Sequence, residues 1–396
     1  MEILFWSRVG FELFLNEIYA LGFTVSDAPQ VGARPYGVIG GRSIARWWLV
    51  PLANRHVATS GLALFQPIIP SSKILKRTAT ALNFIGLSSL WARKRVYVTC
   101  PPAFSDLFGN NNLSYAFFTG TDSPHRKTAI QIMGDTGEIK GIAKVSSNVS
   151  VKPLLKHEAE MLNYLNRLDL KTALIPKVLF CGEINGSEVL VTDSLKTART
   201  KTLTTLSEEH IDFLREVAEK TTVPKTDFGE CFLAALRNKY QAVAEKLTDE
   251  WRQRLEKAIG VIAGSVKALG TGCLAHGDFT PWNTFLVDGK LYVFDWEYAN
   301  HTYPRGYDMI HFMLSRPQTN RRSAAAIVKK VIRTLSDTGY ASSNNAAKAL
   351  LMTYLCGHTL QYVGRALVGR RKVSTWDGAD MFAEYIDFLI GADDLG

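Results

Sequence analysis

The feature that most constrains this chain is one short stretch between Leu274 and Glu297. It contains the pattern H-G-D-x-x-x-x-N, in which Asp278 precedes Asn283 by five residues, and Asp295 follows after two short apolar runs. A single aspartate near a hairpin is commonly a turn or capping residue. That interpretation does not account for three oxygen-bearing side chains in so short a stretch, so we expect them to converge on one site.

The two apolar runs have the character of strands, because both are rich in residues that favour strands. They are separated by Asp288-Gly289, a dipeptide that accepts the positive φ angles of a type I′ hairpin turn. If Val287 pairs with Lys290 around this turn, Asn283 lies opposite Phe294. The hairpin is therefore predicted to hold the amide of Asn283 and the carboxylate that follows Phe294 at one end, beside the preceding loop.

This spacing matches the catalytic loop of phosphoryl-transfer enzymes, in which a base precedes a metal-binding asparagine and a second metal-binding carboxylate follows. In that interpretation Asp278 orients a hydroxyl group and accepts its proton. Asn283 and Asp295 hold Mg²⁺, which prefers hard oxygen ligands. Three further residues are expected to support the loop: His276 through hydrogen bonds, Asp308 as an acceptor for backbone N–H groups, and Glu297 either behind the metal or at the acceptor site.

A lysine and a glutamate upstream fit the same chemistry. Alternating runs predict a three-stranded meander over residues 114–120, 128–133 and 139–145, and Lys144 lies in its third strand. A lysine inside an apolar strand is costly unless it is paired or contacts a ligand. The next predicted helix, residues 152–168, carries Glu158, and in kinases such a pair holds the nucleotide phosphates. The alternative is that Lys144 extends from an edge strand to solvent.

Two other positions are predicted to contact the nucleotide, which is ATP or another NTP. Gly120 begins the turn between the first two strands of the meander, where a phosphate-binding loop is expected. Thr192 follows a strand predicted over residues 187–191, where the chain crosses into a second lobe and its backbone could meet an adenine edge.

The composition bounds the class of protein. The chain has 396 residues, of which 46% are hydrophobic and 21% charged, as in a globular protein with a sizeable core. Its five cysteines are scattered without a C-x-x-C pair, which argues against disulfides and structural zinc and favours a reducing compartment. No secretory signal is evident, and no apolar run approaches the ~20 residues that span a bilayer. We therefore expect a cytoplasmic protein.

Residues 1–105 are predicted to form an N-terminal module of unknown role. Residues 1–100 carry eleven Lys/Arg against four Asp/Glu, so most of the net charge of +9 lies there and the chain as a whole is not expected to bind nucleic acid. A strand is predicted over residues 46–50 and a helix with basic ends over residues 71–92. The helix could dock on an anionic membrane or a phosphorylated partner. Packing on a domain is the favoured alternative, because polar residues dilute its apolar face: Thr78, Thr80, Asn83, Ser88 and Ser89.

The remainder is predicted to form a lobe of strands, residues 106–193, and a mainly helical lobe, residues 194–396. Helical spacing of apolar residues recurs through the second lobe, over residues 208–220, 228–247, 249–269, 324–337, 346–367 and 379–390. The end of the chain is acidic: Asp377, Asp380, Glu384, Asp387, Asp393 and Asp394.

At these residues the chain resembles the aminoglycoside phosphotransferase and choline kinase family, small-molecule kinases with a protein-kinase-like α+β fold of two lobes. The resemblance covers roughly residues 114–390 and rests on His276-Gly277-Asp278, Asn283 and Asp295-Trp296-Glu297, with weaker support from Lys144, Glu158 and Gly306-Tyr307-Asp308. One departure is the turn after residue 119, which has a single glycine. The loop has H-G-D where regulated protein kinases have H-R-D, and little chain separates Asp295 from Pro304. Both features favour a small-molecule kinase.

The resemblance leaves several alternatives open. The phosphoryl acceptor is a small-molecule hydroxyl compound, which could be a sugar, an amino alcohol or an aminoglycoside. A nucleotide-binding scaffold without activity and a protein kinase are the competing functions. The basic N-terminal module leaves open a peripheral contact with a membrane.

Overall fold

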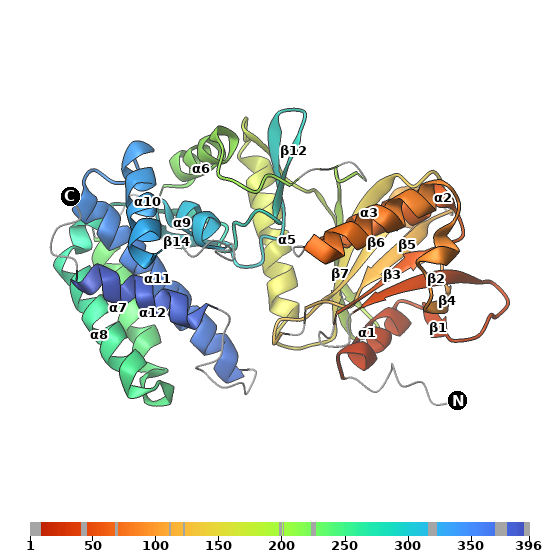
Figure 1. Ribbon diagram of the computed structural model, residues 1–396, viewed down its shortest axis with the longest axis horizontal. Coiled ribbons are helices and arrows are strands. Elements are labelled where there is room, and N and C mark those ends of the chain that lie inside the picture. Colours follow the sequence, from red (N-terminus) through yellow and green to blue (C-terminus); the bar gives the residue numbers. More distant parts are fainter. Residues whose placement is uncertain are drawn as a thin grey trace.

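A computed structural model describes residues 9–40, 46–67, 70–110, 112–121, 123–197, 200, 202–222, 227–315, 323–368 and 378–391. Figure 1 shows two lobes side by side, a sheet lobe from the first half of the chain and a mainly helical lobe from the second, with α5 between them. This confirms the predicted α+β architecture. No helix in the described ranges is long and apolar enough to cross a membrane.

The sheet lobe is built on one antiparallel sheet. Its described strands follow the order β1-β4-β2-β3-β5-β6-β7-β10-β9. The strands are β1 Thr24–Ser26, β2 Ala33–Gly40, β3 Trp47–Pro51, β4 Arg95–Thr99, β5 Ser114–Phe118, β6 Thr128–Met133, β7 Ile139–Ser146, β9 Val178–Ile184 and β10 Ser187–Asp193. The predicted meander is confirmed as β5, β6 and β7.

The N-terminal extension is part of this sheet. Strand β3 pairs with β5, with Trp48 opposite Phe118 and Leu49 opposite Phe117, so four strands of the extension continue the meander without a break. The predicted extra N-terminal strands and helices are present, and backbone hydrogen bonding joins them to the meander at β3 and β5.

Helices cover both faces of the sheet. Helix α1 (Val9–Ala20) packs on one face, where Phe14 meets Phe117 and Phe11 meets Trp47 in edge-to-face contacts. The opposite face is covered by α2 (Arg55–Gly61), α3 (Pro70–Phe84) and α5 (Lys152–Arg167). Short helices η1 (Leu62–Leu64), η2 (Ser88–Leu90) and α4 (Ser105–Phe108) lie in the connections. Helix α3 is shorter than predicted, because Gly86, with a φ of 78°, turns the chain after Phe84.

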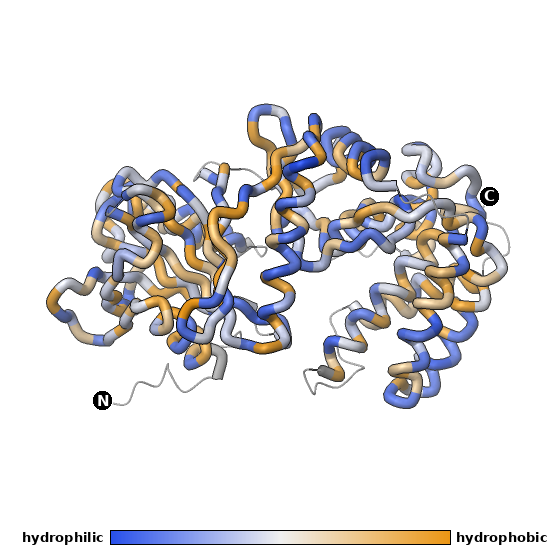
Figure 2. The backbone as a smooth tube through the Cα atoms, turned by 180° about the vertical axis from the view of Figure 1, so that it is seen from behind, coloured by the Kyte–Doolittle hydropathy of each residue, from blue (hydrophilic) through white to orange (hydrophobic). Residues whose placement is uncertain are grey.

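The helical lobe combines a bundle with short strands. Its helices are α6 Glu208–Thr221, α7 Phe228–Gln241, η3 Ala244–Lys246, α8 Asp249–Gly264, η4 Val266–Leu269, α9 Tyr307–Leu314, α10 Ala324–Asp337, α11 Asn344–Val368 and α12 Ala379–Gly391. Its strands are β8 Ala173–Leu174, β11 Gly272–Ala275, β12 Thr284–Val287, β13 Lys290–Val293 and β14 Asn300–Pro304. Figure 2 shows hydrophilic and hydrophobic residues alternating along α5, as its position between the lobes requires.

Phe14 tests the packing between the extension and the sheet. Its side chain is fully buried against Phe11 and Phe117, so Phe14→Ala should lower the free energy of unfolding by about 3–5 kcal/mol. Its neighbour Leu13 is 41% exposed, and Leu13→Ala should cost far less. Chemical denaturation of both variants measures the difference, and equal small losses would show that α1 does not belong to the core.

Candidate active site

The loop after β11 is held from behind by a carboxylate. Asp308, in the first turn of α9, accepts hydrogen bonds from the backbone N–H of His276 (2.6 Å) and of Gly277 (3.0 Å). Burial raises the pKa of Asp308, and His276 and the two N–H donors counteract that rise. Gly277 has a φ of 77°, and a Cβ there would lie 2.5 Å from the carbonyl oxygen of Tyr298, so the turn requires glycine.

His276 joins the loop to the end of the hairpin. Its Nδ1 accepts from the backbone N–H of Asp278 (3.3 Å), which leaves Nε2 to donate to the carbonyl oxygen of Phe294 (2.9 Å). The ring is fully buried and lies 4.4 Å, centroid to centroid, from that of Trp296. His276 therefore sits where it can brace the loop and is closed off from solvent.

The carboxylate of Asp278 is held at both of its oxygens. Asn283 Nδ2 donates to its Oδ2 (3.1 Å) and to its backbone oxygen (2.9 Å), while His311 Nε2 donates to its Oδ1 (3.1 Å). His311 Nδ1 lies 3.0 Å from the hydroxyl of Tyr354. The side chain of Asp278 remains 34% exposed, so a substrate can reach it.

The sequence analysis missed His311. Helix α9 is a run of eight mostly apolar residues, too short for helical spacing to identify. The available signal was an aspartate and a histidine, Asp308 and His311, three residues apart within that apolar run. A buried polar pair at helical spacing faces one side of a helix, and here that side faces the loop.

The hairpin has the predicted register. Thr284 pairs with Val293 and Val287 with Lys290, and the N–H of Phe294 donates to the carbonyl oxygen of Asn283 at 3.2 Å. Both turn residues, Asp288 and Gly289, have positive φ angles, as a type I′ turn requires. Asn283 and Asp295 consequently leave the ladder at the same end.

A buried cluster of charges links the two lobes at that end. Lys144 Nζ on β7 donates to Glu158 Oε2 on α5 (2.7 Å) and to Asp295 Oδ1 (2.6 Å). Lys144 therefore does not extend to solvent. Burial alone would raise the pKa of Asp295, but Lys127 and Lys144 together hold it well below its usual range. Burial alone would lower the pKa of Lys144, but Asp295 and Glu158 raise it.

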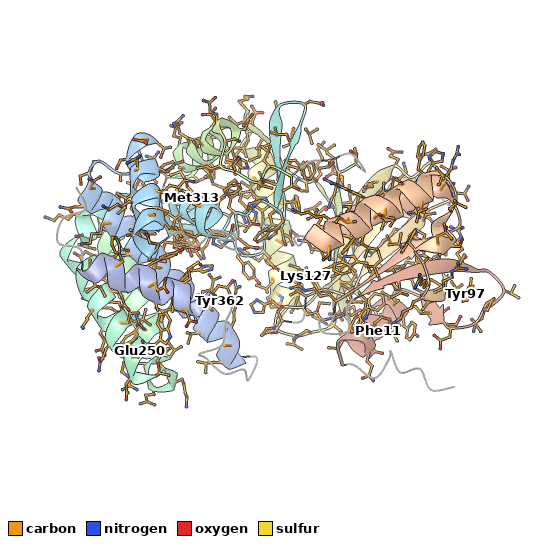
Figure 3. All side chains as sticks on the ribbon, in the orientation of Figure 1. Phe11, Tyr97, Lys127, Glu250, Met313 and Tyr362 are labelled. Atoms are coloured by element: carbon orange, nitrogen blue, oxygen red, sulfur yellow. The ribbon has the colours of Figure 1, made fainter. Side chains whose placement is uncertain are left out.

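Lys127 is a second lysine in this cluster, and the sequence analysis missed it as well. Its Nζ lies 3.3 Å from Asp295 Oδ1 and makes an ion pair with Glu297. Burial raises the pKa of Glu297, Lys127 lowers it, and the net shift is upward. Figure 3 shows Lys127 where the sheet lobe meets the helical lobe. Nothing in the sequence links it to a carboxylate 168 residues away.

The loop between β5 and β6 carries Lys127 to this position. Gly120, with a φ of 85°, begins the loop, and a Cβ there would lie 2.3 Å from the carbonyl oxygen of Lys127. His125 Nδ1 lies 2.8 Å from the hydroxyl of Tyr298, so the loop also contacts the segment after Asp295. Gly120 thus belongs to the loop that covers the carboxylates.

Thr192 is the predicted site residue that lies apart from this cluster. It follows Leu190 by two places on β10, so it points to the same sheet face as Lys144, which is opposite Leu190. It is partly exposed and lies at an irregularity of the β9–β10 pairing, where the chain leaves the sheet. The other predicted residues, including the pair of Lys144 and Glu158, are brought together.

The donor set fits a hard divalent cation. In the charge cluster two lysines face three carboxylates, so one negative charge is uncompensated: Lys127 and Lys144 against Glu158, Asp295 and Glu297. Asn283 uses its amide nitrogen on Asp278, and its amide oxygen accepts no hydrogen bond among the described residues. No group of three His, Cys, Asp or Glu side chains that could hold a metal occurs in the described ranges. A cation here would therefore need ligands from a bound molecule as well.

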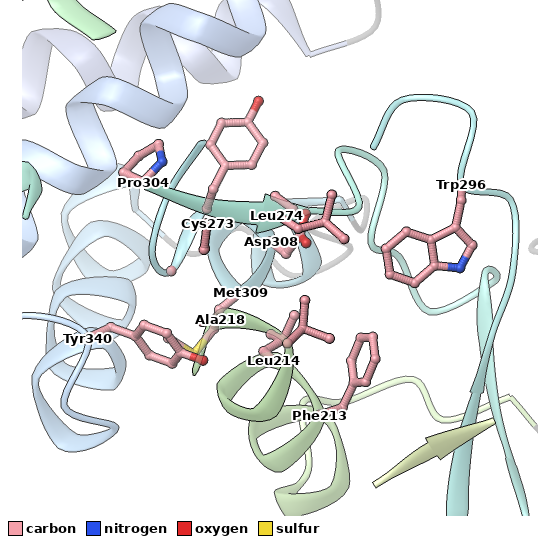
Figure 4. A pocket seen from close by; sticks show the side chains of 14 residues that line it. Phe213, Leu214, Ala218, Cys273, Leu274, Trp296, Pro304, Asp308, Met309 and Tyr340 are labelled. Carbon is pink, nitrogen blue, oxygen red and sulfur yellow. The ribbon is translucent and has the colours of Figure 1, made fainter. Parts of the chain in front are cut away.

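A separate cavity lies behind the loop, in the core of the helical lobe. Figure 4 shows its apolar lining from α6, β11 and α9, including Leu214, Leu274 and Met309, with Asp308 at its side. It contains none of the exposed oxygens of the site, and its lining packs the base of the loop.

A two-lobed fold with an aspartate loop, an asparagine, a second aspartate and a lysine–glutamate pair between the lobes defines a phosphoryl-transfer enzyme of the kinase type. The sequence pattern of the phosphotransferase enzyme family matches residues 133–333, just over half of the chain. The chain belongs to this phosphotransferase family. A search of curated proteins finds no match.

Solved structures similar to this one include phosphotransferases and small-molecule kinases. An aminoglycoside phosphotransferase, a thermostable mutant in its apo form, is 17% identical, with 74% of this chain and 99% of that chain covered and a TM-score of 0.49. A spectinomycin phosphotransferase in complex with ADP and spectinomycin is 12% identical (71% and 92% covered, TM-score 0.41). An ethanolamine kinase of Plasmodium vivax is 11% identical (83% and 96% covered, TM-score 0.41).

His210 makes the stability of this region depend on pH. Its Nδ1 accepts from the backbone N–H of Ser207 (3.2 Å), and its Nε2 lies 3.4 Å from the hydroxyl of Thr284 on β12. Burial lowers the pKa of His210 to about 4. The imidazole of His210 therefore binds a proton more readily in the unfolded chain than in the folded one. The free energy of unfolding should fall by roughly 3 kcal/mol as the pH falls from about 6.5 to 4.

The measurement is the free energy of unfolding as a function of pH. His210→Asn should flatten the slope over this range without abolishing it, because burial also lowers the pKa of His358. His56→Asn, at an exposed position of α2, is the matched control and should keep the slope of the unmodified protein. An unchanged slope in His210→Asn would contradict the assignment.

Proposed function

We propose that this protein is an ATP-dependent kinase that transfers the γ-phosphoryl group to a hydroxyl of a small molecule. The observation that carries the proposal is Lys144, whose ammonium group bridges Glu158 and Asp295 beside the loop of Asp278 and Asn283. Family membership supports a phosphotransferase but does not name the acceptor. The proposed use of ATP and of a hydroxyl acceptor therefore rests on the chemistry of these side chains.

Asp278 is the proposed catalytic base. Its carboxylate is partly exposed, and hydrogen bonds from Asn283 and His311 hold its oxygens in fixed directions. A base held in this way can accept the hydroxyl proton without first reorganising. His311 touches the carboxylate and not the reacting group, so we assign it a positioning role.

Mg²⁺ is the proposed metal, with Asn283 and Asp295 as its protein ligands and phosphate oxygens completing its shell. When bound, the ion would neutralise charge on the transferred phosphoryl group. Two protein oxygens suit Mg²⁺, which usually takes few protein ligands and keeps substrate or water oxygens. The negative charge in excess within the cluster favours a cation at this point.

Lys127 and Lys144 are the proposed contacts for the phosphate chain. Both ammonium groups pair with Asp295, which a bound cation would also neutralise. The lysines could then pair with the phosphates of a bound nucleotide instead. In a glycine-rich loop, backbone N–H groups contact the phosphates. In the loop that begins at Gly120, the ammonium group of Lys127 would take that role. Thr192, at the crossing between the lobes, is the proposed contact for the base.

The short connection after Asp295 favours a small-molecule acceptor over a protein. Between Asp295 and α9 the chain forms β14, paired with β11, which leaves no long segment for the activation loop of a regulated protein kinase. The class of acceptor is a sugar, an amino alcohol or an aminoglycoside-like compound. In the acidic C-terminal region Asp387 is paired with Arg254 at 2.8 Å. Asp377, Asp393 and Asp394 lie outside the described residues.

Asp278→Asn tests the reaction. Removing a general base should lower turnover by about 10²–10⁴-fold while ATP still binds with Mg²⁺. The substrate panel is sugars, amino alcohols and aminoglycosides with ATP and Mg²⁺, assayed for phosphorylated product. The matched control is Asp288→Asn at the exposed hairpin turn, which should retain full turnover. Full turnover in Asp278→Asn would refute the base, ATP binding without any product would indicate an inactive scaffold, and label on protein would indicate a protein kinase.

Lys127→Met tests the second phosphate contact. Loss of the ammonium group should weaken binding of Mg²⁺–ATP by about tenfold, the usual scale for one charge-assisted hydrogen bond of 1.5 kcal/mol or more. Titration calorimetry with ATP measures the affinity. Lys140→Met on β7, where the lysine pairs with the exposed Glu138, is the matched control. Equal affinity in the two variants would remove Lys127 from the nucleotide site.

A further inference from the structure

Helix α3 presents its apolar side to solvent. Ile74, Thr78, Ala81 and Ile85 follow one another at helical spacing, so they lie along one face, and all four are exposed. Large apolar side chains exposed on α3 and on the turn that follows are Ile74 (63%), Leu75 (42%), Phe84 (67%), Ile85 (62%), Leu87 (45%) and Leu90 (60%). We call these six residues, with the basic residues beside them, the α3 surface. A helix of a folded lobe normally buries such a stripe.

The side of α3 that faces the sheet is small and polar. Ala79 and Asn83 are fully buried there, and Asn83 Oδ1 accepts a hydrogen bond from Trp91 Nε1 at 2.7 Å. Thr80 turns its hydroxyl back to the carbonyl oxygen of Lys76 at 2.8 Å. Two of the polar residues expected to dilute the apolar face, Thr80 and Asn83, therefore do not lie on it. The exposed face is more apolar than its sequence suggests.

Basic residues flank this apolar surface along the chain, and no acidic residue occurs among them. No Asp or Glu occurs between Asp27 and Asp106, and ten Lys or Arg residues do. Those exposed on α3 and on the segment leading into β4 are Lys73, Arg77, Arg93, Lys94 and Arg95. An apolar face flanked by lysine and arginine is the composition of helices that lie in the interface of anionic membranes.

We propose that the α3 surface docks on an anionic phospholipid bilayer, with its apolar side chains in the headgroup boundary and its basic residues on the lipid phosphates. The positive charge of the α3 surface favours an anionic bilayer over a second copy of the chain. Two such surfaces face to face would bring their basic residues together, and these would repel one another. The proposal concerns docking alone and does not depend on the reaction at Asp278.

Docking would bring the space between the lobes close to the bilayer. Burial, together with the nearby ammonium group of Lys76, lowers the pKa of Lys196 to about 7. Lys196 lies in the linker after β10, so the first turns of α3 lie beside the connection between the lobes. Figure 1 shows the same arrangement, with α3 across the sheet lobe and its first turn towards the helical lobe.

The test is flotation of the full-length protein with vesicles of phosphatidylcholine alone or with one-third phosphatidylglycerol, at low and at high salt. We expect binding to the anionic vesicles at low salt, at least tenfold less binding to neutral vesicles, and a marked loss at high salt. The apolar variant is Ile74→Ser with Ile85→Ser, and the basic variant is Lys73→Gln with Arg77→Gln. Each should reduce binding by tenfold or more.

Matched controls distinguish binding through the α3 surface from nonspecific adsorption to vesicles. Val149→Ser replaces another exposed apolar residue (81% exposed), and Lys329→Gln with Lys330→Gln replaces exposed lysines on α10; both should bind as the unmodified protein does. Thermal unfolding establishes that each variant is folded. Absent binding, equal binding to neutral vesicles, equal loss in the controls, or a dimer that the Ile74→Ser, Ile85→Ser variant abolishes would each overturn the proposal.

Discussion

The ion pairs around Lys144 are the interaction on which the arrangement of the two lobes depends. A lysine from β7, a glutamate from α5 and an aspartate from the hairpin meet where water is largely excluded. Leaving any one of these charges buried without its partner would cost several kcal/mol. The cluster therefore couples the position of α5 and the sheet to that of the loop that carries Asp278. Lys127 adds a second link from the loop between β5 and β6.

Behind that cluster the loop is held by buried groups. Asp308 and His276 each accept from the backbone of the loop, and both belong to the core of the helical lobe. The turn at Gly277 is unstrained, because glycine adopts the required positive φ without a clash. The carboxylate of Asp278, the proposed base, is thus exposed on a supported loop, an arrangement that suits a base required to act in one orientation.

The N-terminal extension has two faces with different roles. One face of its sheet is buried against α1 through aromatic contacts, which ties the extension to the strands that carry Lys144. The other face is covered by α3, whose outer side is apolar and basic. The favoured interpretation, that α3 packs on a domain, holds for its inner side, where Ala79 is buried against the sheet. Which residues its outer side presents, Ile85 rather than Asn83, depends on which side of the helix meets the sheet.

The sequence by itself determined the elements whose signal is local. The hairpin register follows from Asp288-Gly289, the helix over residues 324–337 from its apolar spacing, and the convergence of Asn283 and Asp295 from that register. Only the tertiary structure decided that the extension joins the same sheet, that His311 holds Asp278, and that Lys127 reaches the carboxylates. These contacts join residues that are far apart in the chain. The charge or hydropathy of a side chain does not indicate which distant residue it will contact. Such pairings are selected by packing and by the cost of burying an unpaired charge, which exist only once the chain is folded.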